Sequence, residues 1–149
     1  MRSEGISGPA ALDFWVGDWV CTWDGGHGRN RVAMELDDHV VVERFDSLAP
    51  ERWSGMSVSV FDARDGRWRQ TWVDSTGNYW ALEEGRDQDD LTFEVDETEV
   101  RDDGSRVDVR KRMVFSDVAE DSFHWRWERS VDDGDSWEPL WTIDYHRAT

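Results

Sequence analysis

Residues 14–23 read FWVGDWVCTW, and this stretch decides the fold because of the spacing of its tryptophans. Trp15, Trp19 and Trp23 are four residues apart, and side chains two or four residues apart share one face of a β-strand. Similar spacing recurs along the chain, which has eleven tryptophans in 149 residues. We therefore expect a first strand over Phe14–Trp23, and further strands that each place aromatic side chains on one side. A small barrel can bury such faces around a core or a cavity.

Turn signals divide the rest of the chain at intervals of about ten residues, the spacing typical of all-β sandwiches and barrels. Examples are GGHG at 25–28, ARDG at 63–66 and DDGS at 102–105. The pattern predicts about ten strands and no long amphipathic helix. Short connections favour a single antiparallel up-and-down barrel over a Greek-key sandwich, whose crossovers need longer loops. We expect this all-β domain to span residues 11–149, after a flexible lead-in at residues 1–10.

The charge balance limits the partners of the chain. It has 34 acidic residues against 17 lysines and arginines, a net charge of −17. Nucleic acid and anionic membrane both require a basic surface, so neither is an expected partner. Cys21 is the single cysteine, which excludes an intramolecular disulfide, and the sequence has no long apolar run. These features predict a soluble cytoplasmic protein.

Three segments resemble a known class of barrel. Gly17-Asp18-Trp19 resembles the G-x-W signature of lipocalin-like (calycin) barrels, in which the tryptophan packs across the closed end of the barrel. With LDFWVGDW at 12–19, VFDARDGRWRQTWVDSTGNY at 60–79 and WERSVDDGDSWEPLWTIDY at 127–145, the chain is similar to a group of small bacterial calycin-like proteins. The resemblance implies the barrel fold and a cavity, and it brings no established catalytic residues.

Other motifs are structural or absent. Residues 130–137, SVDDGDSW, resemble the Asp-box hairpin of sialidase propellers, but a single copy predicts only a hairpin, capped by Asp132 and turned at Gly134. The histidines lack metal-ligand spacing, and the sequence has no P-loop or dinucleotide fingerprint, so we expect no metal and no cofactor. Haem-binding calycin-like relatives use a histidine near the C-terminus. His146 is the candidate here, but strand parity places it on the outer face.

Strand parity also predicts which side chains face the interior. Most positions on the aromatic side are apolar, and the opposite positions are mostly charged. The polar exceptions on the aromatic side are Gln70, Asp74, Lys111, Arg129 and Tyr145. Buried polar groups must be paired or face a wet cavity. They either satisfy one another, for instance Asp74 with Lys111 or Arg129, or they contact a ligand.

We expect a cavity that binds a small hydrophobic or aromatic molecule. Its walls would be Trp72, Trp125, Trp127 and Trp141, and the groups that orient the ligand would be Gln70, Asp74, Arg129 and Tyr145. One alternative is an isomerase, cyclase or hydrolase in which Asp74 is the acid or base and Tyr145 or Arg129 stabilises an oxyanion. A raised pKa of Asp74 would favour catalysis, and firm structural pairing would not. A second alternative is a filled barrel that acts through its surface, as a homodimer.

Overall fold

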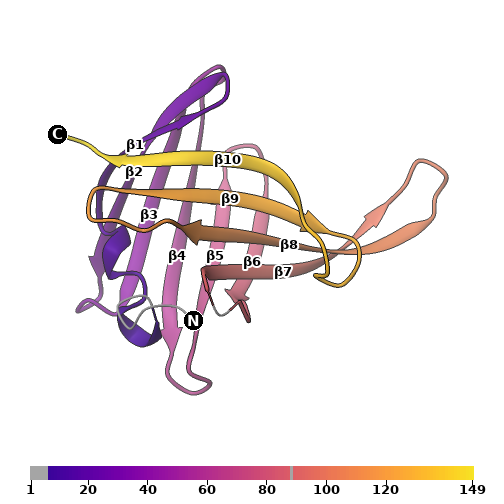
Figure 1. The fold of residues 1–149 in the computed structure, drawn as a ribbon, viewed down its shortest axis with the longest axis horizontal. Helices are drawn as coiled ribbons and strands as arrows, with labels where there is room; N and C mark the ends of the chain where they lie inside the picture. The colour runs from indigo at the N-terminus through magenta and orange to yellow at the C-terminus, as the bar shows by residue number, and fades with distance from the viewer. Residues whose placement is uncertain (1–6, 88) are drawn as a thin grey trace.

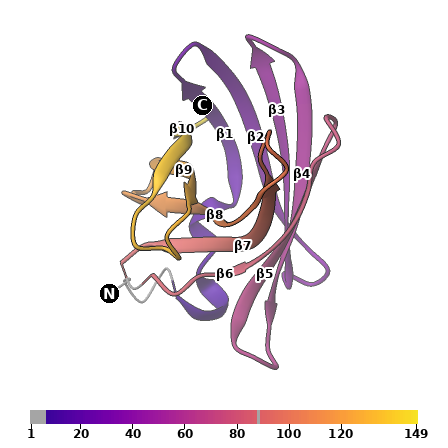
Figure 2. The ribbon, with the colours of Figure 1, turned by 90° about the vertical axis from the view of Figure 1, so that its right-hand side faces the viewer.

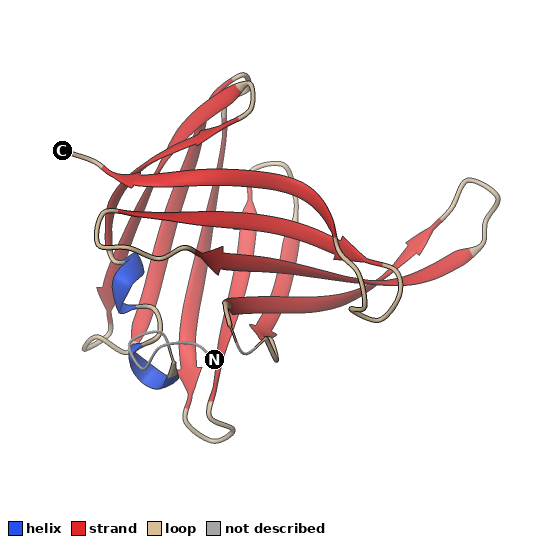
Figure 3. Ribbon diagram, in the orientation of Figure 1, coloured by secondary structure: helices blue, strands red, loops and turns tan. Residues whose placement is uncertain are grey.

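The chain folds into ten β-strands and two short 3-10 helices (Figure 3). The structure is a computed structural model that describes residues 7–87 and 89–149. The helices are η2 (Gly8–Ala10) and η3 (Asp13–Trp15). The strands are β1 (Gly17–Trp23), β2 (Gly26–Glu35), β3 (Val40–Ala49), β4 (Trp53–Asp62), β5 (Arg67–Asp74), β6 (Tyr79–Glu84), β7 (Leu91–Val100), β8 (Arg106–Ser116), β9 (Ser122–Ser130) and β10 (Glu138–Arg147).

The strands close into one barrel. Each strand pairs antiparallel with the next, and β1 pairs with β10, where Cys21 lies opposite Tyr145. Figure 1 shows β7 to β10 crossing in front of β3 to β6 at a steep angle. The predicted fold, a closed antiparallel up-and-down barrel of ten strands, is confirmed. Among the described residues, no helix has the length and apolar character needed to cross a bilayer.

The first strand begins later than the sequence analysis predicts. Trp15 belongs to η3, and β1 begins at Gly17, whose φ is 141°. A side chain at Gly17 would also collide with the guanidinium of Arg147, so this position requires glycine. The GGHG segment is likewise shorter as a turn than expected, because β2 already begins at Gly26.

The N-terminal helices close one end of the barrel. The indole of Trp19 donates a 2.8 Å hydrogen bond to the carbonyl of Trp15, and the indole of Trp68 donates one of 2.9 Å to the carbonyl of Gly8. Trp15 and Trp19 are both buried, and Trp19 packs edge-on against Phe123. This apolar plug fills the end of the barrel at which β1 begins, so a ligand cavity has to lie toward the other end.

The inner face of the sheet is the one that parity predicts. Trp19, Cys21, Trp68, Leu82 and Ile143 are all buried. Positions of the opposite parity carry exposed charged side chains in most strands. Ion pairs between exposed side chains such as these add little stability individually. The packing of the interior therefore determines the fold.

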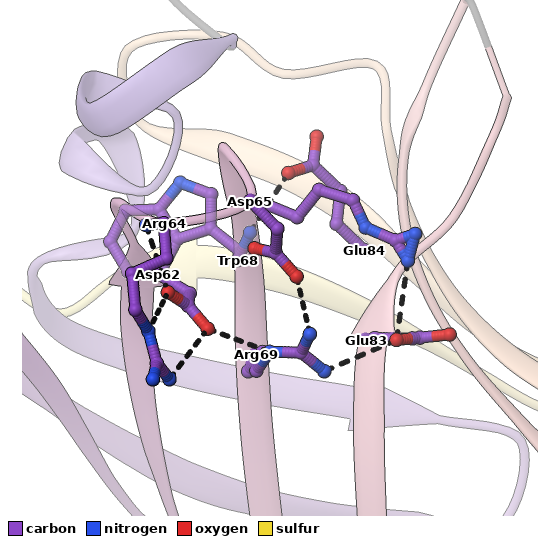
Figure 4. Close-up of polar contacts among 8 residues, drawn as sticks. Asp62, Arg64, Asp65, Trp68, Arg69, Glu83 and Glu84 are labelled. Atoms are coloured by element: carbon purple, nitrogen blue, oxygen red, sulfur yellow. Dashed lines mark hydrogen bonds and ion pairs between the residues drawn. The ribbon is translucent and has the colours of Figure 1, made fainter.

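Figure 4 shows one group of charged residues on the outer face, where β4, β5 and β6 lie side by side. The guanidinium of Arg69 binds Asp62 at 3.2 Å, Glu83 at 3.2 Å and the carboxylate of Asp65. One arginine thus links three acidic residues from two strands and the turn between β4 and β5. The pairing reduces repulsion among acidic side chains on a strongly acidic chain.

Strands β6 and β7 have the shortest pairing of any neighbouring strands in the barrel. These two strands pair only at Glu83 with Glu94 and at Glu84 with Phe93. Beyond this point β7 pairs with β8 alone, and the two strands leave the barrel as a hairpin that projects to the right in Figure 1. Figure 2, turned by 90°, shows β7 running directly above β6. The base of the hairpin therefore lies beside the open end of the barrel.

Candidate functional site

A cavity of about 210 Å³ occupies the barrel toward the end opposite the N-terminal helices. It extends from Asn78, which is exposed, to Glu43, which is buried, so it connects the surface with the interior. Six indoles form most of its wall. The lining residues are Glu43, Phe45, Trp53, Trp72, Asp74, Asn78, Trp80, Met113, Trp125, Trp127, Trp141, Ile143 and Tyr145.

The indoles hold one another by edge contacts. The ring of Trp141 lies 5.7 Å from that of Trp125 and 5.1 Å from that of Trp23, both nearly perpendicular. The ring of Trp127, whose residue pairs with Trp141 across β9 and β10, lies 5.2 Å from that of Trp80. Such edge and tilted pairs are favoured by the ring quadrupole, and they fix the orientation of each ring. The aromatic wall is therefore a preformed surface.

A buried carboxylate lies at the inner end of the cavity. Glu43 Oε2 accepts a 2.7 Å hydrogen bond from the amide of Asn30, and Oε1 accepts one of 2.6 Å from the hydroxyl of Ser57. Glu43 is only 6% exposed. Burial raises its pKa from 4.5 to about 6, although the hydrogen bonds from Ser57 and Asn30 act in the opposite direction.

Tyr145 and Cys21 complete this polar group. The hydroxyl of Tyr145 accepts a 3.0 Å hydrogen bond from Asn30 and is also hydrogen-bonded to the thiol of Cys21. Burial raises the pKa of both the Tyr145 phenol and the Cys21 thiol well above their ordinary values. Both groups are therefore neutral at physiological pH, and the thiol is not an activated nucleophile.

Asp74 lies at the rim and is occupied by the local turn. Its carboxylate accepts hydrogen bonds from the indole of Trp72 at 2.9 Å and from the side chains of Thr76 and Asn78. Burial acts to raise the pKa of Asp74, but the hydrogen bonds from Thr76, Trp72 and Asn78 outweigh it and lower the pKa to about 2. The expected pairing of Asp74 with Lys111 or Arg129 is wrong, because the turn takes both of its oxygens.

The other two expected orienting groups lie outside the cavity lining. Gln70 is buried and donates a 2.9 Å hydrogen bond to the hydroxyl of Ser59. Arg129 binds both carboxylate oxygens of Glu99 at 3.1 Å, at the base of the projecting hairpin. Lys111 binds Glu97 at 3.1 Å in the same region. Lys111 and Arg129 are paired within the protein, as one of the two sequence interpretations proposes, whereas Gln70 is paired only through its amide nitrogen.

The cavity lining includes all four tryptophans that the sequence predicts as its walls, and two of the four predicted orienting groups. Trp72, Trp125, Trp127 and Trp141 all line it, together with Asp74 and Tyr145. Sequence reasoning missed Glu43, although the alternation in VVVERF places it between Val41 and Phe45 on the inner face. A glutamate at an inward position of a strand was the available signal. Asn30 and Ser57, which bind it, lie at inward positions of the neighbouring strands.

The turn of the last hairpin and His146 lie apart from the cavity lining. In the last hairpin, Asp132 accepts hydrogen bonds from Ser130 and Ser136, and Gly134 has a φ of 89°. The ring of Trp137 lies under the guanidinium of Arg112 at 3.9 Å, apart from the cavity lining. His146 is exposed. Within residues 7–87 and 89–149, no group of three or more His, Cys, Asp or Glu side chains could hold a metal ion.

No protein-family model matches the chain, and no curated protein sequence matches it. The function has to be argued from the cavity itself.

Proposed function

We propose that the protein is a calycin-like barrel that binds a small hydrophobic or aromatic molecule in its tryptophan-lined cavity. The observation that carries the proposal is the continuous aromatic wall around a space that extends from the surface to Glu43. Ligand sites typically combine such apolar walls with a few fixed polar groups. The volume of about 210 Å³ lies below the ~300–1,000 Å³ of sites for drug-sized molecules. The expected ligand is correspondingly small.

The cavity also bears on the alternative of a filled barrel. A barrel that acted only through its surface would gain stability by filling this space, because unfilled volume forfeits contacts on every side. The chain instead places polar groups at both ends of the cavity, Glu43 inside and Asp74 with Asn78 at the rim. Polar groups at fixed positions support the binding of a ligand in one orientation.

Fluorescence titration with phenethyl alcohol, a neutral aromatic probe, tests the proposal. Saturable change in the tryptophan emission is expected for the wild-type protein. Trp72→Ala should weaken binding by about 1 kcal/mol or more, the scale of one lost aromatic contact. Val73→Ala is the matched control, because Val73 is the next residue of β5 and is 40% exposed on the outer face. Equal binding by both variants, or no saturable binding, would refute the proposal.

A second candidate function is acid–base catalysis, and the raised pKa of Glu43 favours it. A carboxylate with a pKa of about 6 is near the value that suits proton transfer at neutral pH, whereas Asp74 at about 2 is not. The reaction class would be removal of a proton next to a carbonyl group. Exchange of the methylene protons of phenylacetone in heavy water, followed by NMR, tests this candidate. Exchange that is faster than in buffer and lost in Glu43→Gln would support it, and exchange at the buffer rate would exclude this activity.

A further inference from the structure

The ionisable groups around the cavity have one sign. Glu43 and Asp74 line it, and none of the other described lining residues is a lysine, arginine or histidine. The two basic side chains that the sequence places on the aromatic side, Lys111 and Arg129, are held by Glu97 and Glu99. The cavity is thus a negative site within a chain whose net charge is −17. Its electrostatic potential attracts cations and repels anions.

Among the described residues, no basic side chain is paired with the buried carboxylate of Glu43. Its hydrogen-bond donors, Asn30 and Ser57, are both neutral. The nearby titratable groups, Cys21 and Tyr145, are neutral as well because their pKa values are raised. Buried charges in proteins are usually paired with an opposite charge, because hydrogen bonds alone do not replace the lost solvation. A cationic ligand in the cavity can supply this opposite charge next to Glu43.

Asn30 holds two of the lining side chains, Glu43 and Tyr145, in place through its amide group. Its amide nitrogen donates to both Glu43 and Tyr145, which fixes the orientation of the amide group. Its Oδ1 is buried and has no hydrogen-bond partner among the described residues. Asn30 is not among the residues that line the cavity, so the carboxylate of Glu43 is the acceptor at this end that a hydrogen-bond-donating ligand group can reach.

The aromatic wall favours the same kind of ligand. Indole is the ring that binds cations best through its face, and six indoles line this cavity. The barrel already contains contacts of this kind elsewhere, with the guanidinium of Arg147 at 4.2 Å from the Trp19 ring. Desolvated cation–π contacts are stronger than exposed ones, and each of the six indoles is partly buried against the core.

We propose that the ligand is a small organic amine that binds as its ammonium ion. The ammonium group would face Glu43 at the inner end of the cavity, within reach of the aromatic rings, and the apolar part would extend along the indoles toward the rim. This inference rests on the proposed ligand-binding function and adds the charge of the ligand. A carboxylate at the inner end with tryptophans around it is the arrangement that recognises a cation attached to an apolar group.

Three probes of nearly the same shape separate the charge of the ligand from its apolar part. Phenethylamine is a cation at neutral pH, phenethyl alcohol is neutral and phenylacetate is an anion. Isothermal titration calorimetry on the wild-type protein should show phenethylamine binding at least about tenfold more tightly than phenethyl alcohol, because its charge is paired in a desolvated site. Phenylacetate should bind more weakly than either.

Glu43→Gln keeps the size of the side chain and removes the charge. In this variant phenethylamine should lose its advantage and bind within about twofold of phenethyl alcohol, whose own affinity should change little. Glu35→Gln removes the same charge from an exposed position on β2 and should leave the preference intact. If Glu43→Gln fails to fold, the ratio of the wild-type affinities for phenethylamine and phenethyl alcohol still shows whether the cavity prefers a cation.

The outcomes distinguish this inference from the function on which it rests. If phenethyl alcohol binds as tightly as phenethylamine, the cavity binds apolar molecules and the ammonium inference is wrong. Preference for phenylacetate would also overturn it. If none of the three probes binds saturably, both the ammonium inference and the proposed function fail.

Discussion

The amide of Asn30 on β2 donates a 2.7 Å hydrogen bond to the buried carboxylate of Glu43 on β3. The two side chains lie on the inner face of the barrel, where Asn30 is 0% and Glu43 is 6% exposed. A neutral donor lowers the cost of burying the charge without cancelling it, and burial still raises the pKa of Glu43 to about 6. The folded protein therefore holds a proton on Glu43 more tightly than the unfolded chain does.

This difference predicts how stability depends on pH. Because the pKa of Glu43 is higher in the folded state, its contribution favours folding at low pH and is lost as the pH rises through the interval from 4.5 to about 6. Relative to Glu43→Gln, the wild-type protein should lose about 2 kcal/mol of unfolding free energy between about pH 4 and pH 7. Urea denaturation of both proteins across this range measures the difference. If the difference in unfolding free energy between the two proteins stays constant with pH, the pKa of Glu43 is the same in the folded and unfolded states.

The two carboxylates of the cavity should titrate far apart. Carboxyl carbon NMR of the folded protein should place the Glu43 transition at about pH 6 and the Asp74 transition at about pH 2. The physical reason is that Glu43 is desolvated with two neutral donors, whereas Asp74 accepts a full set of turn hydrogen bonds. Ser57→Ala removes one donor to Glu43 and should raise its pKa further, without moving that of Asp74. Similar pKa values for both groups would contradict the described geometry.

Trp19→Ala should strongly destabilise the barrel. Trp19 is 1% exposed, donates to the carbonyl of Trp15 at 2.8 Å and packs against Phe123 at 4.9 Å. Removing a buried tryptophan costs roughly 3–5 kcal/mol, since the plug around it cannot fill the space. Trp137→Ala is the comparison, because Trp137 lies outside the barrel under Arg112 and should cost about 1 kcal/mol. Thermal unfolding would measure both, and equal losses would contradict the assigned role of Trp19.

The sequence predicts the barrel and its inner face well, because alternation in a strand directly encodes which side is buried. The tryptophans at 72, 125, 127 and 141 all reach the cavity for this reason. The same rule fails at Trp15, whose spacing from Trp19 fits a strand although the residue lies in η3. Tertiary contacts at the closed end, such as Arg147 against Gly17, decide where β1 begins, and local spacing contains no information about them.

Polar side chains are harder to assign than apolar ones, because parity shows the face but not the partner. Arg129 and Gln70 lie on the predicted side of the sheet, but Arg129 binds Glu99 and Gln70 donates a hydrogen bond to Ser59. Those partners come from strands whose register is set by long-range pairing, which the sequence pattern does not specify. Glu43 was open to prediction from its inward position. Its importance depends on its having no basic partner within residues 7–87 and 89–149, which only the three-dimensional structure shows.

The position of Trp72 depends on a glycine of the neighbouring strand. A β-carbon built on Gly55 would overlap the six-membered ring of the Trp72 indole, so the indole occupies the space that a side chain on β4 would fill. Gly55→Ala should therefore displace the Trp72 ring and reshape the cavity, destabilising the protein by about 1–3 kcal/mol. In a Trp72→Ala background the same change should cost little, because the clashing ring is gone. A double-mutant cycle by urea denaturation measures this coupling, and additive effects of the two substitutions would show that Trp72 does not lie over Gly55.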